Sequence, residues 1–376
     1  MKTLIKASDL EKTGFENGLD AFGIAKADQF TKTLEILKAR KDQGLHAGMN
    51  FTYRNPFRST TPALTMSDAQ SLIVGARSYW KTPEEAFDKS DPQGKIALYA
   101  QENHYQKLRE GLSAVAEKLE SEGFKTIILI DDNALVDREA AYQAGIGWYG
   151  KNANILIPKR GSWFVLGSIL TNATFETNTP AKGNCGPCTK CINACPTEAI
   201  ISPGVIDSNR CLAWLVQSPE NFPPEFREAL GDKMYGCDDC QDVCPINKYE
   251  ERIEKLKTRR NRTTVSIFNV LEEDDETLIS KYGRWYIPKR DPRYLRRSAL
   301  LVLGNIGIAE SEKVQTILSR YLESADSMLR SYAVWTAKRL GLTNLLKGME
   351  NDRSEDVQRE LALQVRQVEK TPKAKN

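Results

Sequence analysis

The stretch "CGPCTKCINACP", residues 185–196, holds four of the eight cysteines of this 376-residue chain and ends in Cys-Pro. Its spacing, C-x2-C-x2-C-x3-C-P, suits short loops that direct three thiolates at one iron–sulfur cubane while the fourth serves a second. A second set follows, in which helix-forming residues separate Cys211 from a C-x2-C-x3-C-P remainder at 237–245. The spacing therefore predicts two clusters and uses every cysteine.

The crossed ligation of two-cluster bacterial ferredoxins divides the cysteines into two sets of four. One [4Fe-4S] cluster takes Cys185, Cys188, Cys191 and Cys244, and the other takes Cys195, Cys211, Cys237 and Cys240. Zinc sites and disulfides are the alternatives. Zinc tolerates C-x2-C pairs, but neither alternative explains two Cys-Pro endings or the three-plus-one spacing.

The composition is that of an ordinary globular protein, with 40% hydrophobic and 27% charged residues. We expect a cytoplasmic chain without a membrane segment, because no apolar run approaches the roughly 18 residues that a membrane helix needs. In a reducing compartment, closely spaced cysteines favour metal binding. The net charge of +3 means that any nucleic-acid surface must be a local patch.

The first third alternates helical and strand-like patterns. Helical spacing covers residues 7–19, 30–44 and 104–123, and β-rich apolar runs cover 71–79, 125–130 and 163–172. This is an α/β pattern. After Cys244 a charged connector leads into a wholly helical tail.

The tail contains an internal similarity. "LRRSALLVLGNIG" from Leu295 matches "LRSYAVWTAKRLG" from Leu329, 34 positions later, with Leu, Arg, Ala and the final Gly recurring. Two copies are typical of a short HEAT-like solenoid. Two merely similar core helices are the alternative.

One-electron clusters usually feed a flavin, haem, metal or corrinoid. The chain has only His46 and His104, no spare cysteine, no G-x-G-x-x-G after a strand, and no D-x-H-x-x-G segment. A corrinoid would therefore have to bind without a histidine presented beneath it.

The chain resembles the epoxyqueuosine reductases, cobalamin and iron–sulfur enzymes that complete queuosine at the tRNA wobble position. The resemblance covers nearly the whole chain and is carried by "DDNALVDREAAYQAGIGWYGKN" (131–152), "GSWFVLGSILTN" (161–172), both cysteine sets and the helical tail. Reductive dehalogenases are related. Two departures leave roles open, because His104 precedes Tyr105 where many members have Tyr-His, and Asp132 stands beside the key aspartate.

The resemblance implies an α+β, multidomain fold. A nitroreductase-like α/β domain (1–174) would bind cobalamin, a bacterial ferredoxin-like domain (175–250) would hold two [4Fe-4S] clusters, and a HEAT-like repeat (251–376) would bind a tRNA anticodon stem-loop. The implied partner is a low-potential donor of the flavodoxin or ferredoxin type, and the chain is expected to be a monomer.

The resemblance also makes Asp131 the proton donor beside the corrin. Removing an epoxide oxygen requires a proton, and a carboxylic acid in an apolar pocket stays protonated near neutral pH. From the residues alone, a polar turn at a strand end is the better interpretation of 131–133, and only the resemblance favours the acid. Because side chains alternate along a strand, Asp132 should point away from Asp131.

Further cobalamin contacts come from the same comparison. They are Arg58, Ala97, Lys151, Asn152, Ile155, Leu166, Ala213 and Ser218. The glycines of "AGIGWYGKN" permit close backbone approach, either to the cofactor or within a packed turn. Otherwise, Arg58 fits a surface loop and the apolar members fit a core.

A basic stretch with interleaved aromatics suits RNA phosphates and bases. Its candidate contacts are Arg259, Arg260, Arg262, Arg284, Trp285, Arg296 and Arg297. A solvated charged face is the alternative.

The implied function is reduction of epoxyqueuosine to queuosine in tRNA, using cob(I)alamin fed by the two clusters. By the same comparison, the cluster of Cys195, Cys211, Cys237 and Cys240 is the one nearer the cobalt. The alternatives are a reductive dehalogenase of small molecules and an electron-transfer ferredoxin subunit that docks a larger reductase.

Overall fold

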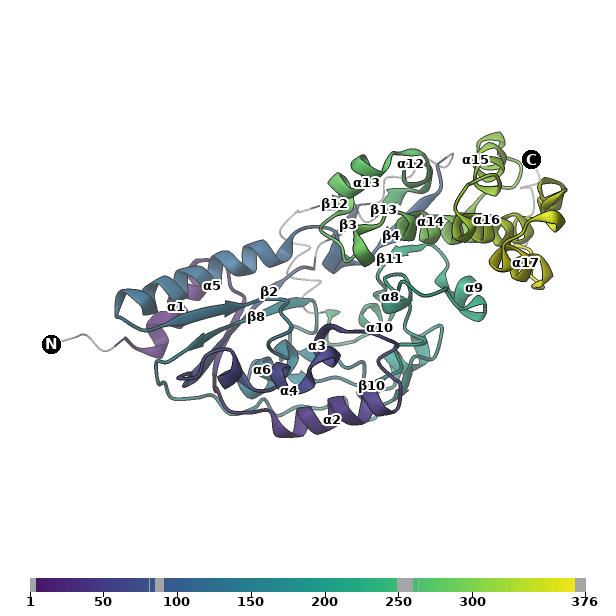
Figure 1. Cartoon of the computed structure of the whole chain (residues 1–376). Helices are drawn as coiled ribbons and strands as arrows, with labels where there is room; N and C mark the ends of the chain where they lie inside the picture. The colour runs from purple at the N-terminus through teal and green to yellow at the C-terminus, as the bar shows by residue number, and fades with distance from the viewer. Residues whose placement is uncertain (1–4, 81, 85–90, 249–259, 263, 369–376) are drawn as a thin grey trace. The chain divides into compact units, whose positions relative to one another are not determined.

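The computed structural model describes residues 5–80, 82–84, 91–248, 260–262 and 264–368 (Figure 1). Contacts between residues divide the chain into two compact units. The first comprises 1–82, 101–211 and 238–261, and the second comprises 83–100, 212–237 and 262–376. The three functional domains expected from the sequence stay a prediction. Within the described ranges, no helix is both long and apolar enough to cross a membrane.

The first unit contains most of the regular elements of the amino-terminal half and most of the cysteine region. Its helices are α1 (Ala7–Glu16), α2 (Thr31–Asp42), α3 (Phe51–Arg54), α4 (Pro56–Ser59), α5 (His104–Ser121), α6 (Asp137–Gln143), α7 (Lys190–Ala194) and α10 (Asp239–Asp242). Its strands are β1 (Ala21–Lys26), β2 (Ser71–Ser78), β5 (Thr126–Leu129), β6 (Trp148–Tyr149), β7 (Ile155–Leu156), β8 (Phe164–Thr171), β9 (Ile200–Ser202) and β10 (Val205–Ile206). The helices predicted at 7–19, 30–44 and 104–123 are confirmed.

An antiparallel sheet in the order β1-β2-β8-β5 forms the centre of this unit. Strands β2 and β8 pair over eight residues, from Ser71 opposite Thr171 to Ser78 opposite Phe164. Strand β5 pairs with the other edge of β8, from Thr126 opposite Thr171 to Leu129 opposite Ser168. The three strands predicted from apolar runs are therefore the middle and one edge of a single sheet.

Helices cover both faces of this sheet. In Figure 1, α1 and α5 lie together along one face, where α5 packs on β2, β5 and β8. Glycines permit this close approach, because a Cβ added to Gly167 would lie 2.9 Å from Leu112. On the other face, the alanines of α6 pack against Leu72, Val74 and Leu170. The alternation of apolar residues along β2 thus supplies two cores.

The second unit is largely helical. Its helices are α8 (Leu212–Leu215), α9 (Arg227–Leu230), α12 (Ile267–Glu272), α13 (Asp275–Tyr282), α14 (Arg293–Ile306), α15 (Glu312–Leu322), α16 (Ser327–Arg339) and α17 (Glu355–Ala362). A three-stranded sheet in the order β11-β4-β13 joins β11 (Lys233–Tyr235), β4 (Gln93–Ile96) and β13 (Thr264–Ser266). Two short strands, β3 (Thr82–Glu84) and β12 (Arg260–Arg262), each contain a boundary between the two units.

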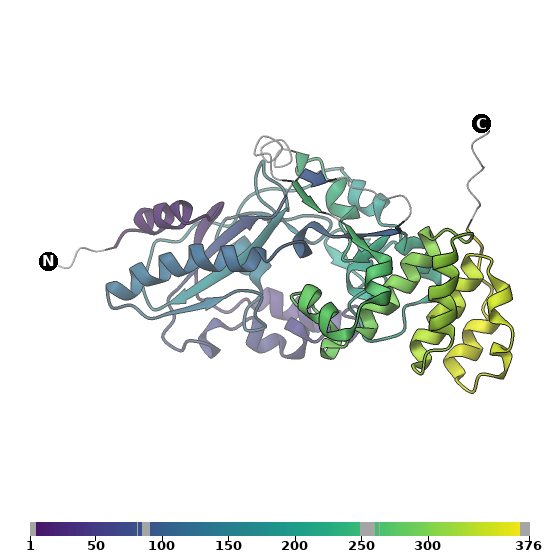
Figure 2. The ribbon, with the colours of Figure 1, turned by 90° about the horizontal axis from the view of Figure 1, so that it is seen from above.

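The two similar segments of the tail are α14 and α16, which pack against each other. The carboxyl-terminal helices lie side by side, coloured green to yellow in Figure 2. Ala299 and Ala333 are fully buried, and a Cβ added to Gly304 would lie 2.6 Å from the Trp335 ring. Small residues on one helix therefore accept large rings from the other.

A buried ion pair joins α9 to α17. The Arg227 guanidinium donates to both carboxylate oxygens of Glu360, each at 2.7 Å, and its Nε donates to the Phe222 carbonyl. The guanidinium also lies over the rings of Tyr332 and Trp335. Such a pair depends on both partners, because either charge alone would be buried without compensation.

Replacing Glu360 with Gln should lower the free energy of unfolding by about 3–5 kcal/mol, since Arg227 would keep its charge in a dry site. The urea midpoint of unfolding measures this change. Glu16→Gln is the matched control, because it removes an exposed pair with Lys12 that is worth about 0–1 kcal/mol. Equal midpoints for the two variants would contradict the prediction.

Candidate functional site

The predicted ligands of one cluster lie close together within the first unit. Burial raises the pKa of the Cys191 thiol, and the charges of Cys185 and Cys244 raise it further. Burial likewise raises the pKa of Cys244, with Cys185 and Cys188 adding to it. Four thiols that interact electrostatically in this way fit the one-cubane set predicted from the spacing. Iron would replace their protons, since the thiolate is the metal ligand.

None of the eight cysteines, all within the described ranges, forms a disulfide. Nor do any three His, Cys, Asp or Glu side chains of the described residues converge enough to hold one metal ion. A cubane spreads its thiolates over four irons, whereas zinc needs all its sulfur ligands at about 2.3 Å from one ion.

The remaining cysteines belong to the predicted second cluster. Cys195 accepts a hydrogen bond from the Ala199 N–H at 3.2 Å, the kind of contact that tunes cluster potentials. Helix α7 follows Cys188, and helix α10 follows Cys237, the corresponding cysteine of the second set. The two helices pack against each other. Cys237 ends a segment of the second unit, whereas Cys195, Cys211 and Cys240 belong to the first. Their shared ligation stays a prediction.

A buried polar network ties the second cysteine set to the start of β8. Asn247 is fully buried and accepts from the Ser162 N–H at 2.7 Å, while its Nδ2 donates to the Gln241 carbonyl at 2.8 Å. The Ser162 hydroxyl donates to Gln241 Oε1 at 2.9 Å. Gly161 is required here, because a Cβ would lie 2.0 Å from Asn247 Oδ1. Sequence reasoning missed these residues, although the polar types of Gln241 and Asn247 near Cys244-Pro245 were a signal.

The segment "GWYGKN" contacts the cysteine loops. Lys151 Nζ donates to the carbonyls of Gly186 at 2.7 Å and Cys188 at 2.9 Å, and Asn152 Nδ2 donates to the Cys240 carbonyl at 3.3 Å. These contacts differ from the cobalamin contacts predicted for Lys151 and Asn152. A Cβ on Gly147 would lie 2.5 Å from the Leu156 carbonyl, so this glycine is explained by a packed turn.

Asp131 lies in a turn after β5. The strand ends at Leu129, and Asp131 has a φ of +50°, in the left-handed region. Asp132 Oδ1 accepts from the Ala134 N–H at 2.7 Å. The predicted polar turn is therefore present. The prediction that Asp132 points away from Asp131 assumed strand alternation, but the strand ends before these residues.

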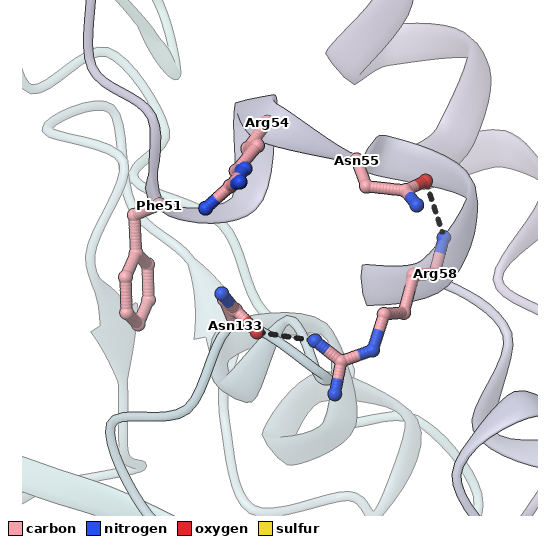
Figure 3. Close-up of a pocket in the computed structure, with 5 residues that line it drawn as sticks. All are labelled: Phe51, Arg54, Asn55, Arg58 and Asn133. Carbon is pink, nitrogen blue, oxygen red and sulfur yellow. Dashed lines mark hydrogen bonds between the residues drawn. The ribbon is translucent and has the colours of Figure 1, made fainter.

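Helix α4 holds the Asp131 loop in place (Figure 3). Arg58 Nη1 donates to Asn133 Oδ1 at 2.5 Å, and the Ser59 hydroxyl donates to the Asn133 carbonyl at 2.6 Å. The Val136 N–H in turn donates to the Ser59 carbonyl at 3.0 Å. Asn55 caps α4 by accepting from the Arg58 N–H. Arg58 therefore bonds the loop that carries the predicted acid, and Ser59 is a second residue holding this loop that the sequence did not identify.

A pocket of about 180 Å³ opens beside this loop. Its lining residues are Phe51, Arg54, Asn55, Arg58 and Asn133 (Figure 3). Drug-sized ligands occupy about 300–1,000 Å³, so this pocket fits a smaller group and not a whole corrin. Its donors suit amide or phosphate oxygens.

Three carboxyl groups interact at this loop. Asp131 is exposed on one side, but the protein atoms around its carboxyl and the charge of Asp132 raise its pKa. Burial raises the pKa of Asp137 strongly, and the charge of Asp131 raises it further, against the opposing effect of Arg138. No described residue forms a hydrogen bond with Asp137 Oδ1. Asp131 can therefore hold a proton at a higher pH than an ordinary aspartate.

The other predicted cobalamin contacts have different surroundings. Ile155 and Leu166 pack with the core beneath α6. Ala97, Ala213 and Ser218 belong to the second unit. Ser218 is buried there, and its carbonyl accepts from Arg297. A cobalamin role for these residues stays a prediction.

Two predicted RNA contacts are wrong. Arg297 is fully buried, and its guanidinium donates to the carbonyls of Leu215, Val216, Ser218 and Glu220. Trp285 is 5% exposed between the rings of Tyr235 and Tyr282, at centroid distances of 4.4 and 4.6 Å. Neither side chain is available to a phosphate or base, because core partners take its polar atoms and ring faces.

The remaining RNA candidates are placed differently. Arg296 pairs with Asp275, and Arg284 is exposed although it donates to the Ala100 carbonyl. The side chains of Arg260 and Arg262, and the whole of Arg259, lie outside the described residues.

Residues 184–247 match the family model described as a 4Fe-4S double cluster binding domain. An epoxyqueuosine reductase of Vibrio cholerae serotype O1 is 31% identical over 88% of this chain and 90% of its own length. The chain belongs to the epoxyqueuosine reductase family.

Further members agree with this assignment. An epoxyqueuosine reductase of Bacillus anthracis is 31% identical over 92% of both chains. An epoxyqueuosine reductase solved with an epoxyqueuosine-modified tRNA-Tyr stem loop superimposes with a TM-score of 0.83, at 27% identity over 94% of this chain and 96% of that one. The likeness extends over both units and confirms a mixed α/β fold of this family.

Asn247→Ala should lower the iron content of anaerobically purified protein, because it leaves the buried Ser162 N–H without a partner, at a cost of about 1–3 kcal/mol. Colorimetric iron analysis measures the loss. Asn209→Ala, an exposed asparagine between Cys195 and Cys211, is the control and should retain wild-type iron. Wild-type iron in Asn247→Ala would show that the network does not support the cluster loops.

Proposed function

We propose that this chain reduces epoxyqueuosine to queuosine at the wobble position of tRNA. Family membership carries the proposal, supported by the relatives named for this activity and by the related structure that contains an epoxyqueuosine-modified stem loop. The Asp131 loop and the four interacting thiols give the first unit both an acid and ligands for an electron carrier.

The proposal includes the architecture and setting expected from the sequence. A nitroreductase-like cobalamin domain (1–174), a ferredoxin-like domain (175–250) and a HEAT-like tail (251–376) would act in one cytoplasmic monomer. A flavodoxin or ferredoxin would supply electrons, passing them through the cluster of Cys185, Cys188, Cys191 and Cys244 to the one nearer the cofactor. The 34-residue offset of the packed helices α14 and α16 supports the repeat.

Cobalamin is the proposed second cofactor. When bound, it supplies a strongly reducing cobalt centre. Arg54, Asn55 and Arg58 suit the amide-bearing edge of a corrin, and the pocket that they line accepts such a group although it is too small for the ring. Asp131 is an exposed residue two positions before Asn133, which lines this pocket, so a cofactor bound there would reach the Asp131 loop.

Asp131 would donate the proton that the departing epoxide oxygen requires. Its raised pKa favours the protonated carboxyl, and the contacts of Arg58 and Ser59 with Asn133 fix the loop that carries it. Prepositioning the acid in this way lowers the reorganisation needed at the moment of proton transfer.

The RNA surface is proposed to use exposed members of the basic stretch. Arg284 is exposed, and Tyr286 is 57% exposed with its ring stacked on Trp214 at 6.5 Å. A supported, exposed tyrosine suits base stacking, which contributes about 1–3 kcal/mol per base. Arg260 and Arg262 remain candidates for phosphate contact.

Anaerobic turnover tests the function directly. The purified chain, reconstituted with iron, sulfide and cobalamin, is given epoxyqueuosine-containing tRNA and a low-potential reductant, and the nucleosides are analysed. Queuosine should appear. Unchanged epoxyqueuosine with fully loaded protein would overturn the proposal, and release of halide from an aryl halide instead would favour a dehalogenase.

Asp131→Asn should lower kcat by about 10²–10⁴-fold, because the amide cannot act as the acid. Asparagine tolerates the left-handed backbone, so this change avoids the strain that Ala would add at φ +50°. tRNA affinity should be unchanged. Asp28→Asn, the same change in an exposed loop, is the control. Full activity of Asp131→Asn would exclude this residue as the acid.

Asp132→Asn should move the alkaline limb of the kcat/KM profile to lower pH. The acid must be protonated, so activity falls as pH rises through the pKa of Asp131. The neighbouring negative charge of Asp132 raises that pKa, and removing the charge lowers it. An unmoved or alkaline-shifted limb would contradict this coupling.

A further inference from the structure

Lys151 has a bridging position that the proposed function does not use. Its ammonium group donates to the carbonyls of Gly186 and Cys188, which lie on the turn between the first two cysteines. The same turn is closed by the Cys188 N–H, which donates to the Cys185 carbonyl at 3.1 Å. One side chain from outside the cysteine region therefore fixes the loop that carries two ligands.

The backbone around Lys151 is itself fixed. Its carbonyl accepts from the Gly204 N–H at 2.9 Å. The next residue, Asn152, is buried and donates to the Cys240 carbonyl. The backbone that carries Lys151 is thus fixed on both sides, and its ammonium group is held by the two carbonyl acceptors.

The charge of Lys151 is also not neutralised locally. Its two hydrogen-bond acceptors are carbonyl oxygens, and no carboxylate among the described residues forms an ion pair with it. A carbonyl bears only a partial charge, so most of the positive charge remains beside the cysteines. Cys185 and Cys188 belong to the thiol set that interacts with Cys191 and Cys244.

We propose that Lys151 positions the Cys185–Cys188 loop and raises the reduction potential of the [4Fe-4S] cluster held by Cys185, Cys188, Cys191 and Cys244. The inference rests on the double-cluster part of the proposed function. Reduction adds one electron and hence one negative charge to the cluster. A fixed positive charge nearby stabilises that reduced state relative to the oxidised one.

The test is a redox titration of the anaerobically purified, iron-loaded chain, followed by electron paramagnetic resonance. Lys151→Met removes the charge at similar length, and Lys151→Arg retains the charge. In Lys151→Met, one of the two couples should favour the oxidised state by about fivefold, which is ~40 mV for one electron. The other couple should stay unchanged. The couple altered by Cys191→Ser identifies the cluster concerned.

Lys12→Met is the matched control, because it removes the same charge from an exposed position on α1. Neither potential should move. In Lys151→Arg, the affected couple should return toward the wild-type value. If Lys151→Met loses about half its iron while Lys151→Arg keeps it, that outcome supports the positioning role through stability of one cluster.

Wild-type iron with both potentials unchanged in Lys151→Met would overturn the inference. A shift that also occurs in Lys12→Met would overturn it as well, because the effect would then be unspecific. A wild-type chain that binds no clusters after reconstitution would overturn both the inference and the double-cluster assignment. A specific shift without turnover of epoxyqueuosine tRNA would support Lys151 and count against the proposed function alone.

Discussion

The pairing of β8 with its two neighbours is the constraint on which the first unit depends. Eight consecutive pairs with β2 fix β8 in the middle of the sheet, and β5 is aligned on its other side. The turn that bears Asp131 follows the end of β5. Ser162 lies just before β8, and its N–H donates to Asn247 of the cysteine region. A shift of register at β8 would therefore move both the acid and the cysteine loops.

Hydrogen bonds from polar side chains to backbone carbonyls hold the functional loops in place. Ser59 donates to the Asn133 carbonyl, Asn247 to the Gln241 carbonyl, and Lys151 to the Gly186 and Cys188 carbonyls. Loops carry backbone groups that regular structure does not satisfy, and burying such groups unpaired is costly. Polar side chains from neighbouring elements satisfy them and, by doing so, determine where each loop lies.

Local patterns were sufficient to predict the long helices, the strands at 71–79, 125–130 and 163–172, and the cysteine sets. The 104–123 helix and the 71–79 strand follow from periodicity, and the three-plus-one spacing of Cys185 to Cys195 identifies clusters before any packing is known. Asn247 and Ser59 could not be found in this way. Their roles arise from bonds between residues 85 and 74 positions apart, which leave no periodic signal in one sequence.

The roles of the basic residues could not be predicted from the sequence either. Arg297 and Arg284 stand in one basic, aromatic stretch, yet Arg297 is buried among four carbonyls while Arg284 is exposed. Burial lowers the pKa of Arg297, but a guanidinium remains charged and requires several acceptors. Because main-chain carbonyls occur at every residue, no acidic partner appears in the sequence to reveal such a site. Lys151 is likewise a cation whose acceptors are main-chain carbonyls. Its position beside the cysteines, which only the structure gives, shows that it fixes a loop.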